Sequence, residues 1–353
     1  MRKGKRLIAW IMAVVMLFTI CVFGGNGTAE AAATTPVAKH GRLSVKGADL
    51  VDSKENKFQL RGISTHGINW DVGSPYVNKK AFKTLRDDWG VNAIRLAMYT
   101  EEYNGYCSGG SQAKLRKLVD KGVGYATDLG MYAIIDWHIL SDGNPNKNKS
   151  QAKKFFTTMA KKYKNNKNVI YEICNEPNGC GWKEIKSYAT DIIKTIRKYD
   201  KKAVIIVGTP TWSQLGTDGT SNEVADSQIK GYKNIMYSLH FYASEWAHNE
   251  YLPAKVAYAR KKKLPIIVSE FGLSPASGDG AINKASADKW MKLLNKYNIS
   301  YFCWSLSNKN ESASLLKPST KKTSGWKSGD LSTAGKYIKK KYLARKKALG
   351  KKA

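Results

Sequence analysis

Two glutamates directly follow apolar, strand-like runs of the sequence. Glu176 ends the run NVIYEICNE, and Glu270 ends LPIIVSE. Carboxylates are among the side chains least often buried without a partner, so their place after such runs asks for a chemical reason. Two carboxylates facing each other across a cleft suit cleavage of a glycosidic bond, in which one donates a proton and the other attacks the sugar or activates water. A structural ion pair with a lysine is the alternative for each residue, and it is weaker for the pair.

Other residues with hydrogen-bonding or aromatic side chains lie at or just after the ends of similar runs. They are His66, Trp70, Arg95, Tyr99, His138, Asn175, Trp212, His240, Tyr242 and Trp304. Aromatic rings at a cleft would form flat platforms that suit the C–H faces of pyranose sugars. Glu172 shares strand parity with Glu176 but lies four residues deeper, so we predict that it is structural and paired.

The histidines also raise the question of a metal site. Zinc enzymes use sets of histidine and carboxylate ligands, often in an H-E-x-x-H motif. The sequence has no such motif and no phosphate-binding glycine loop. We therefore predict no metal and no other cofactor.

Eight short β-rich runs recur along the chain, and amphipathic helical patterns separate most of them. The runs cover residues 58–65, 91–98, 131–138, 168–175, 202–209, 234–241, 264–271 and 299–306. Apolar strands that alternate with helices indicate a parallel sheet covered on both faces. Eight units predict an α/β fold, the (β/α)₈ TIM barrel, whose active sites lie at the carboxyl ends of the strands. A doubly wound open sheet is the alternative, but its glycine-rich turn is missing after the first run.

The segments outside these runs set the expected boundaries. Residues 41–60 alternate in polarity around a DSKENK turn, which predicts a short N-terminal β-hairpin that plugs one end of the barrel. Residues 1–31 have the basic start, apolar stretch and A-x-A-like site of a secretory signal peptide, cleaved near Ala31. An uncleaved membrane anchor is the alternative. We expect one catalytic domain over 34–344 and a basic tail over 345–353.

The formal net charge is +31, from 59 Lys and Arg against 28 Asp and Glu. The lysines are spread over helix-like segments, and no basic and aromatic module of a nucleic-acid-binding kind is present. We therefore predict no nucleic-acid partner, and loose association with anionic cell-surface polymers through the basic residues.

Four cysteines remain after the expected signal peptide. Cys174 and Cys303 lie in apolar runs and are predicted to be buried small hydrophobic residues. Cys107 and Cys180 lie in glycine-rich loops, and the sequence leaves a disulfide between them open.

Six motifs occur in register from about Arg42 to about Lys327, namely IRLAMY, DWH, NEP, SLHFY, SEFG and WSLSNKNE. Together they resemble glycoside hydrolase family 5, in the branch that contains bacterial endo-β-1,4-glucanases. The resemblance implies a bacterial cellulase that hydrolyses internal bonds of a β-1,4-linked polysaccharide with retention of configuration, and the predicted signal peptide implies that it is secreted and extracellular. We expect it to act as a monomer.

The resemblance also implies a role for each matching residue. Glu176 would be the general acid/base and Glu270 the nucleophile. Arg95 would keep Glu270 ionised, Tyr242 would hydrogen-bond to Glu270, and His240 would adjoin Glu176.

Further matching residues would contact the sugars. Asn175 would bind the 2-hydroxyl of the sugar being cleaved, His138 would shape its subsite, and Trp304 would form the floor. Residues on the non-reducing side would be His66, Trp70, Tyr99, Lys309 and Glu311, with Trp212 as a platform on the leaving-group side.

Two rival functions stay open at this stage. One is another β-glycanase of the same family, acting on lichenan, xyloglucan or mannan. The other is a non-catalytic carbohydrate-binding barrel, which predicts the loss of a carboxylate, whereas both carboxylates are present.

Overall fold

The computed structural model describes residues 34–350, whose eight parallel strands form a closed barrel. In barrel order the strands are β3 (Arg61–Thr65), β4 (Ala93–Tyr99), β5 (Tyr132–His138), β6 (Val169–Glu172), β7 (Ile205–Val207), β8 (Ile235–Tyr242), β9 (Ile266–Gly272) and β10 (Tyr301–Leu306). Pairing of β10 with β3 closes the ring. Each strand overlaps one of the eight predicted runs, so the predicted (β/α)₈ barrel is confirmed.

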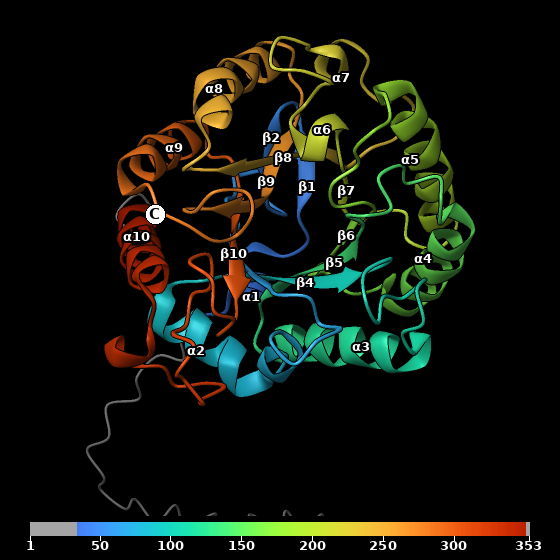
Figure 1. Cartoon of the computed structure of the whole chain (residues 1–353). Helices are drawn as coiled ribbons and strands as arrows, with labels where there is room; N and C mark the ends of the chain where they lie inside the picture. The colour runs from blue at the N-terminus through green and yellow to red at the C-terminus, as the bar shows by residue number, and fades with distance from the viewer. Residues whose placement is uncertain (1–33, 351–353) are drawn as a thin grey trace, which may run out of the picture. The chain divides into compact units, whose positions relative to one another are not determined.

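A ring of helices surrounds the strands (Figure 1). The long helices are α2 (Lys79–Trp89), α3 (Gln112–Asp128), α4 (Lys149–Tyr163), α5 (Trp182–Arg197), α8 (Trp246–Lys261), α9 (Lys284–Tyr297) and α10 (Thr333–Gly350). Shorter helices are α1 (Pro36–His40), η1 (Ser74–Tyr76), α6 (Pro210–Ser213), α7 (Glu223–Asp226) and η2 (Ser328–Asp330). In α5, Ile185, Ile192 and Ile196 recur at helical spacing and are all buried, which gives the helix the apolar face that packs on the barrel.

The N-terminal end of the barrel is closed by the predicted hairpin. Strands β1 (Ser44–Lys46) and β2 (Asp49–Val51) pair antiparallel. Leu43, Leu50 and Phe58 are buried in one apolar cluster with inward-facing residues of the barrel strands. The hairpin turn lies at Gly47, where φ is 61°, and the DSKENK stretch makes the next turn. This end of the barrel is therefore an apolar packed layer.

The two predicted ends of the chain differ in what the structure describes. The predicted signal peptide lies outside the described residues. Helix α10 continues to Gly350, so the boundary predicted at residue 344 falls within a helix. Arg345 donates from Nε to Oε1 of Gln59 at 2.8 Å, so this part of the predicted basic tail is joined to the barrel. Among residues 34–350, no helix is both long and apolar enough to span a membrane.

The four cysteines of residues 34–350 are free thiols. Cys174 and Cys303 are fully buried in the main apolar cluster, as predicted. Cys107 and Cys180 are half-buried and unbridged, so the disulfide that the sequence left open is not formed here.

Candidate active site

The carboxyl ends of the barrel strands open into a cleft of about 570 Å³. Every predicted site residue except Arg95 and Asn175 lines it, namely His66, Trp70, Tyr99, His138, Glu176, Trp212, His240, Tyr242, Glu270, Trp304, Lys309 and Glu311. Arg95 and Asn175 are fully buried beneath its floor. The barrel thus gathers residues that are up to 245 positions apart in the sequence around one opening.

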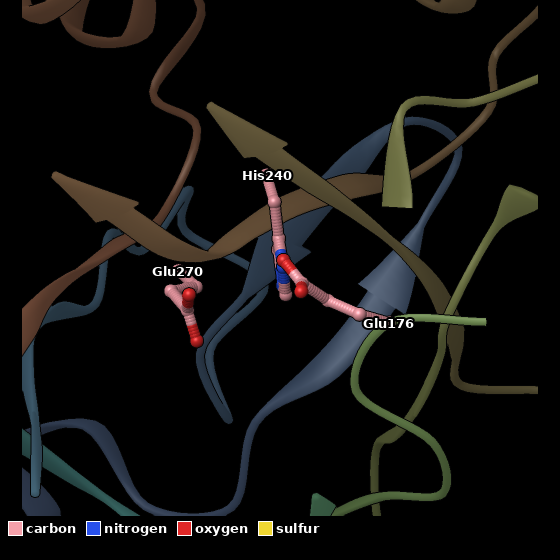
Figure 2. Close-up of side chains that lie close together, drawn as sticks. All are labelled: Glu176, His240 and Glu270. Atoms are coloured by element: carbon pink, nitrogen blue, oxygen red, sulfur yellow. The ribbon is translucent and has the colours of Figure 1, made fainter. Parts of the chain in front are cut away.

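The two predicted carboxylates lie close together. Glu176 follows β6, Glu270 lies in β9, and His240 comes from β8. One ligand-capable atom of each of these three residues lies within 4.8 Å of the others. Figure 2 shows the His240 ring against the Glu176 carboxylate, with Glu270 facing them. His240 Nδ1 is 2.9 Å from Glu176 Oε1, whereas Tyr242 donates its hydroxyl to Glu270 Oε1 at 2.8 Å.

Arg95 sits under both carboxylates and pairs with three acidic residues. Its Nε lies 2.7 Å from Glu172 Oε2, its Nη2 lies 3.0 Å from Asp136 Oδ2, and its Nη1 lies 3.1 Å from Glu270 Oε2. These neighbours raise the pKa of the Arg95 guanidinium against the opposing effect of burial. Glu172 is therefore a buried, paired structural residue, as its strand parity predicted.

Asn175 is held in one orientation by its neighbours. Its Oδ1 accepts from Arg95 Nη2 at 2.6 Å, and its Nδ2 donates to Ile139 O at 3.1 Å and to His138 Nε2 at 3.2 Å. Both amide hydrogens are thus used inside the protein, so Oδ1 keeps the spare capacity for a substrate hydroxyl.

Asp136 is a site residue that sequence reasoning missed. It is fully buried, pairs with Arg95, and accepts a hydrogen bond from His138 Nδ1 at 2.5 Å. It fixes the His138 tautomer, because Nε2 of that ring then accepts from Asn175. Its position two residues before His138 on the same strand face was the signal that could have identified it.

The outer cleft on one side is built from two aromatic rings in contact and a salt bridge. The Trp70 and Tyr99 ring centroids lie 4.5 Å apart. His66 Nε2 is 3.7 Å from Glu311 Oε1, and Lys309 Nζ is 2.5 Å from Glu311 Oε2. This wall combines apolar platforms with a few oriented polar groups, which is how protein sites recognise sugars and other polar ligands.

Comparison with known proteins decides the family of this barrel. Residues 51–310 match the profile "Cellulase (glycosyl hydrolase family 5)". The chain belongs to glycosyl hydrolase family 5. An endoglucanase of Clostridium saccharobutylicum is 46% identical over 341 residues, which is 95% of this chain and 72% of that protein. Endoglucanase 5 of Pectobacterium carotovorum subsp. carotovorum is 44% identical and covers 92% of this chain, which spans 62% of that longer protein.

Solved structures agree with the family assignment. The catalytic domain of Thermobifida fusca endoglucanase Cel5A, solved with cellotetraose, superposes with a TM-score of 0.81 at 36% identity. The match covers 88% of this chain and 99% of that domain. The structure of the cellulase Cel5C_n gives a TM-score of 0.82 at 38% identity over 88% of this chain and 94% of that chain. The protein is therefore a glycoside hydrolase of the endoglucanase type.

In this family 5 barrel, burial raises the pKa values of the two glutamates and lowers those of the two histidines. Burial raises the pKa of Glu176 to about 8, and the negative charges of Asp136 and Glu172 add to the effect against the opposing Arg95. Burial and the Glu176 charge raise the pKa of Glu270, while Arg95 and the nearby histidines oppose the rise. Burial lowers the pKa of His240 to about 4 and, together with Arg95, that of His138 to about 3. Both rings are neutral near pH 7.

The opposite wall of the cleft carries Trp212 on a strained turn. Its backbone is left-handed, with φ of 52°, and the residue is 44% exposed. Its N–H donates to Pro177 O at 3.1 Å, and Ser213 Oγ donates to Asn175 O at 2.7 Å. The loop that carries Trp212 is therefore bonded directly to the loop that carries Glu176.

Several other cleft residues have no motif or strand parity that could have revealed them. His248 lies in the first turn of α8, and the others lie on loops, namely Glu102, Leu140, Gln214, Glu245, Ala276, Ser277 and Gly278. Their backbone positions depend on the tertiary course of the loops after the strands.

The cluster of Glu176, His240 and Glu270 also has the composition of a cation site. Four of its ligand-capable atoms already have partners: His240 Nδ1 is hydrogen-bonded to Glu176 Oε1, and Arg95 and Tyr242 bond the two oxygens of Glu270. A cation at the same place would face the Arg95 guanidinium, so these residues suit proton transfer and nucleophilic attack better than metal binding.

Proposed function

We propose that this endoglucanase cleaves internal β-1,4-glucosidic bonds with retention of configuration, using Glu176 as acid/base and Glu270 as nucleophile. The short approach of the two carboxylates carries the proposal: their nearest ligand-capable oxygens lie within 4.8 Å. Retaining enzymes hold the two carboxyl groups about 5–5.5 Å apart, whereas inverting enzymes need about 6.5–9.5 Å to fit a water molecule. The environments support the division of roles, because Arg95 is paired with the Glu270 carboxylate, whereas Glu176 is hydrogen-bonded to the neutral His240 ring.

The first step forms a covalent glycosyl-enzyme. A Glu270 oxygen attacks the anomeric carbon while the proton on Glu176 passes to the glycosidic oxygen, and the chain beyond the bond leaves as an alcohol. Arg95 and Tyr242 orient Glu270 for attack in this step. In the second step they stabilise the Glu270 carboxylate as it leaves the sugar.

The second step returns the enzyme to its starting state. Glu176, now a carboxylate, takes a proton from water, whose oxygen attacks the anomeric carbon and releases Glu270. The sugar leaves with its original β-configuration, and the proton is again on Glu176.

The substrate we propose is a soluble or amorphous β-1,4-glucan. The cleft is open and carries aromatic platforms on both sides of the carboxylates, at Trp70 and Tyr99 on one wall and at Trp212 on the other. Two matched relatives are named endoglucanases, and the Thermobifida domain was solved with cellotetraose. Lichenan, xyloglucan and mannan remain the rival substrates within the family.

Product analysis on cello-oligosaccharides of defined length tests the proposal. Proton NMR of fresh product should show the β-anomer first, followed by slow appearance of the α-anomer as the sugar equilibrates. Initial release of the α-anomer would overturn the retaining mechanism. Release of reducing ends from carboxymethylcellulose, compared with mannan and barley glucan, separates the substrates, and no release from carboxymethylcellulose would rule out the first choice.

We further propose that the enzyme is secreted, acts as a monomer, and associates loosely with anionic cell-surface polymers. Helix α9 has four lysines with Asp288 as its one acidic residue, and α10 has seven Lys or Arg and no acidic residue. The helices are adjacent, since Lys341 Nζ on α10 lies 2.6 Å from Asp288 on α9. This basic face lies on the helical ring, whereas the cleft lining is rich in glutamate.

Salt elution from polyglutamate beads tests the basic face. The triple variant Lys336→Glu, Lys340→Glu, Lys347→Glu should elute at lower salt than the matched α4 triple variant Lys153→Glu, Lys154→Glu, Lys161→Glu. Equal elution of the two variants would show that net charge alone acts. Size-exclusion chromatography checks the monomer.

A further inference from the structure

A chain of buried hydrogen bonds runs from Glu176 into the barrel interior. Glu176 Oε1 lies 2.9 Å from His240 Nδ1, and His240 Nε2 lies 2.9 Å from Ser269 Oγ. The Ser269 and Ser238 hydroxyls are hydrogen-bonded to each other, and Ser238 Oγ donates to Glu172 Oε1 at 3.1 Å. Both serines and Glu172 are fully buried, so water does not substitute for any link.

The inner end of this chain fixes the direction of every bond. Glu172 is ion-paired with Arg95, so its Oε1 accepts and Ser238 spends its single hydrogen there. Ser269 must then donate to Ser238, which leaves the Ser269 oxygen as the acceptor for His240 Nε2–H. A neutral ring with its hydrogen on Nε2 has a lone pair on Nδ1. The hydrogen between His240 and Glu176 therefore belongs to Glu176.

We propose that Ser238 and Ser269 are positioning residues that lock His240 in its Nε2–H tautomer and thereby keep the proton of the general acid on Glu176. The proposal rests on the proposed role of Glu176 and adds two residues to the machinery. Neither serine lines the cleft and both are fully buried, so they can act on Glu176 only through His240.

The lock explains how the acid is reset in each cycle. Once Glu176 has given up its proton, its carboxylate faces the Nδ1 lone pair at 2.9 Å, an arrangement of two acceptors. That arrangement favours recovery of a proton from the attacking water. The lowered pKa of His240, about 4, keeps the ring from taking the proton itself.

Other charged groups also face this pair, and the serine variants leave them unchanged. They are Arg95 on β4, Asp136 and His138 on β5, Glu172 on β6, Tyr242 on β8, His248 on α8 and Glu270 on β9. A change in protonation after a serine substitution therefore reports on the hydrogen-bond chain.

The pH dependence of kcat/KM on a cello-oligosaccharide tests the lock in Ser269→Ala. Without the Ser269 oxygen, His240 can carry its hydrogen on Nδ1 and donate it to the ionised Glu176. The alkaline limb should then move to lower pH by about one unit, the effect of one hydrogen bond to a charged group. Hydrolysis of dinitrophenyl cellobioside, whose leaving group needs no proton, should keep its wild-type rate of glycosylation.

Controls separate the lock from general packing effects. Ser269→Thr keeps the hydroxyl and should restore the wild-type limb. Ser314→Ala removes a buried hydroxyl that has no hydrogen-bond partner within residues 34–350 and should leave the profile unchanged. Nitrogen-15 NMR of wild-type His240 should show the Nε2–H tautomer, and Ser269→Ala should lose it.

The proposal is overturned if wild-type His240 carries its hydrogen on Nδ1, or if the alkaline limb of Ser269→Ala stays in place. If Ser269→Ala fails to fold, Ser238→Ala breaks the chain one link further in and should give the same shift. Glu176→Gln distinguishes the two levels of inference: survival of the alkaline limb in that variant would refute the role of Glu176 itself, whatever the tautomer.

Discussion

The two carboxylates of the mouth are the same residue type at the ends of two barrel strands, yet their surroundings differ in kind. Glu270 is held by a cation, Arg95, and by the Tyr242 hydroxyl. The Glu176 side chain is 12% exposed, and among residues 34–350 its carboxyl group is hydrogen-bonded to the neutral ring of His240 alone. Donors favour a carboxylate, whereas burial beside an acceptor favours a carboxylic acid. The strands position the two carboxyl groups, and the residues bonded to them (Arg95, Tyr242 and His240) make one a nucleophile and the other an acid.

Replacing each carboxylate in turn should break the comparison most strongly. Glu270→Ala removes the attacking atom and should lower kcat on the order of 10⁶-fold, as loss of a nucleophile does in other hydrolases. Glu176→Ala removes proton transfer and should cost about 10²–10⁴-fold on a natural substrate. On dinitrophenyl cellobioside, Glu176→Ala should still form the glycosyl-enzyme.

Added azide distinguishes the two variants by product. Glu176→Ala should release β-cellobiosyl azide, because azide attacks the covalent intermediate from the face that water would use. Glu270→Ala should release the α-azide, because azide occupies the vacated space of the nucleophile. The reverse pattern would exchange the two assigned roles, and near-full activity of Glu270→Ala would refute the mechanism.

Removing Arg95 should abolish the electrostatic difference between Glu270 and Glu176, because Glu270 loses its cationic partner. Arg95→Met leaves Asp136, Glu172 and Glu270 buried without their cation, which should cost roughly 3–5 kcal/mol of unfolding free energy near pH 7. Burial raises the pKa of Asp136 and of Glu270 and Arg95 opposes the rise, so both pKa values should rise further without Arg95, and stability is present at low pH and is lost as pH rises through those values. The deficit should therefore be smaller at pH 5 than at pH 8.

Denaturant unfolding at several pH values measures this effect, and Arg61→Met is the matched control. Arg61 is a buried arginine at the other end of the barrel and bonds the Gly90 carbonyl at 3.3 Å. It has no acidic partner within residues 34–350, so its loss should destabilise equally at both pH values. A pH-independent deficit in Arg95→Met would contradict the pairing described here. In the same variant, the acid limb of kcat/KM should move to higher pH, because Glu270 loses its cation.

Substitutions in the two walls of the cleft should have smaller effects on kcat/KM and should shift the preferred cleavage site in opposite directions. Trp212→Ala removes a platform on one side and Trp70→Ala removes one on the other, each lowering kcat/KM on cello-oligosaccharides about tenfold, which corresponds to about 1.4 kcal/mol. The preferred bond should shift along the oligosaccharide in opposite senses, as read from product lengths. Trp246→Ala is the control, because that residue is 68% exposed and does not line the cleft. Equal cleavage patterns in all three variants would show that the rings are not platforms.

The sequence predicts the barrel and most of its mouth because both follow from local patterns. Apolar runs of strand length define β3 to β10, and a polar residue at the end of such a run marks the cleft, as for Glu176 and Glu270. Asp136 was missed because it lies inside a run, where its purpose depends on Arg95 from another strand. Gln214 and Glu245 were missed because loop positions carry no periodicity. The direction of the Ser269–His240 hydrogen bond depends on which neighbouring groups donate and which accept, and only the folded site defines those neighbours.

Removal of divalent metals by chelation should have the smallest effect of all. Unchanged activity would support separate roles for Glu176 and Glu270 as acid and nucleophile. Glu176, His240 and Glu270 could together ligate a cation, but His240 Nδ1, Glu176 Oε1 and both Glu270 oxygens already have protein partners, and Arg95 lies 3.1 Å from Glu270 Oε2. Overnight dialysis against EDTA should leave kcat/KM and the melting temperature unchanged, and added Zn²⁺ should inhibit if it acts at all, because it would compete for the Glu176 proton site. Loss of activity on dialysis, with recovery on adding one divalent metal, would replace the carboxylate pair with a metal mechanism. The two carboxylates would then share one role as ligands, and their different surroundings would no longer explain the chemistry.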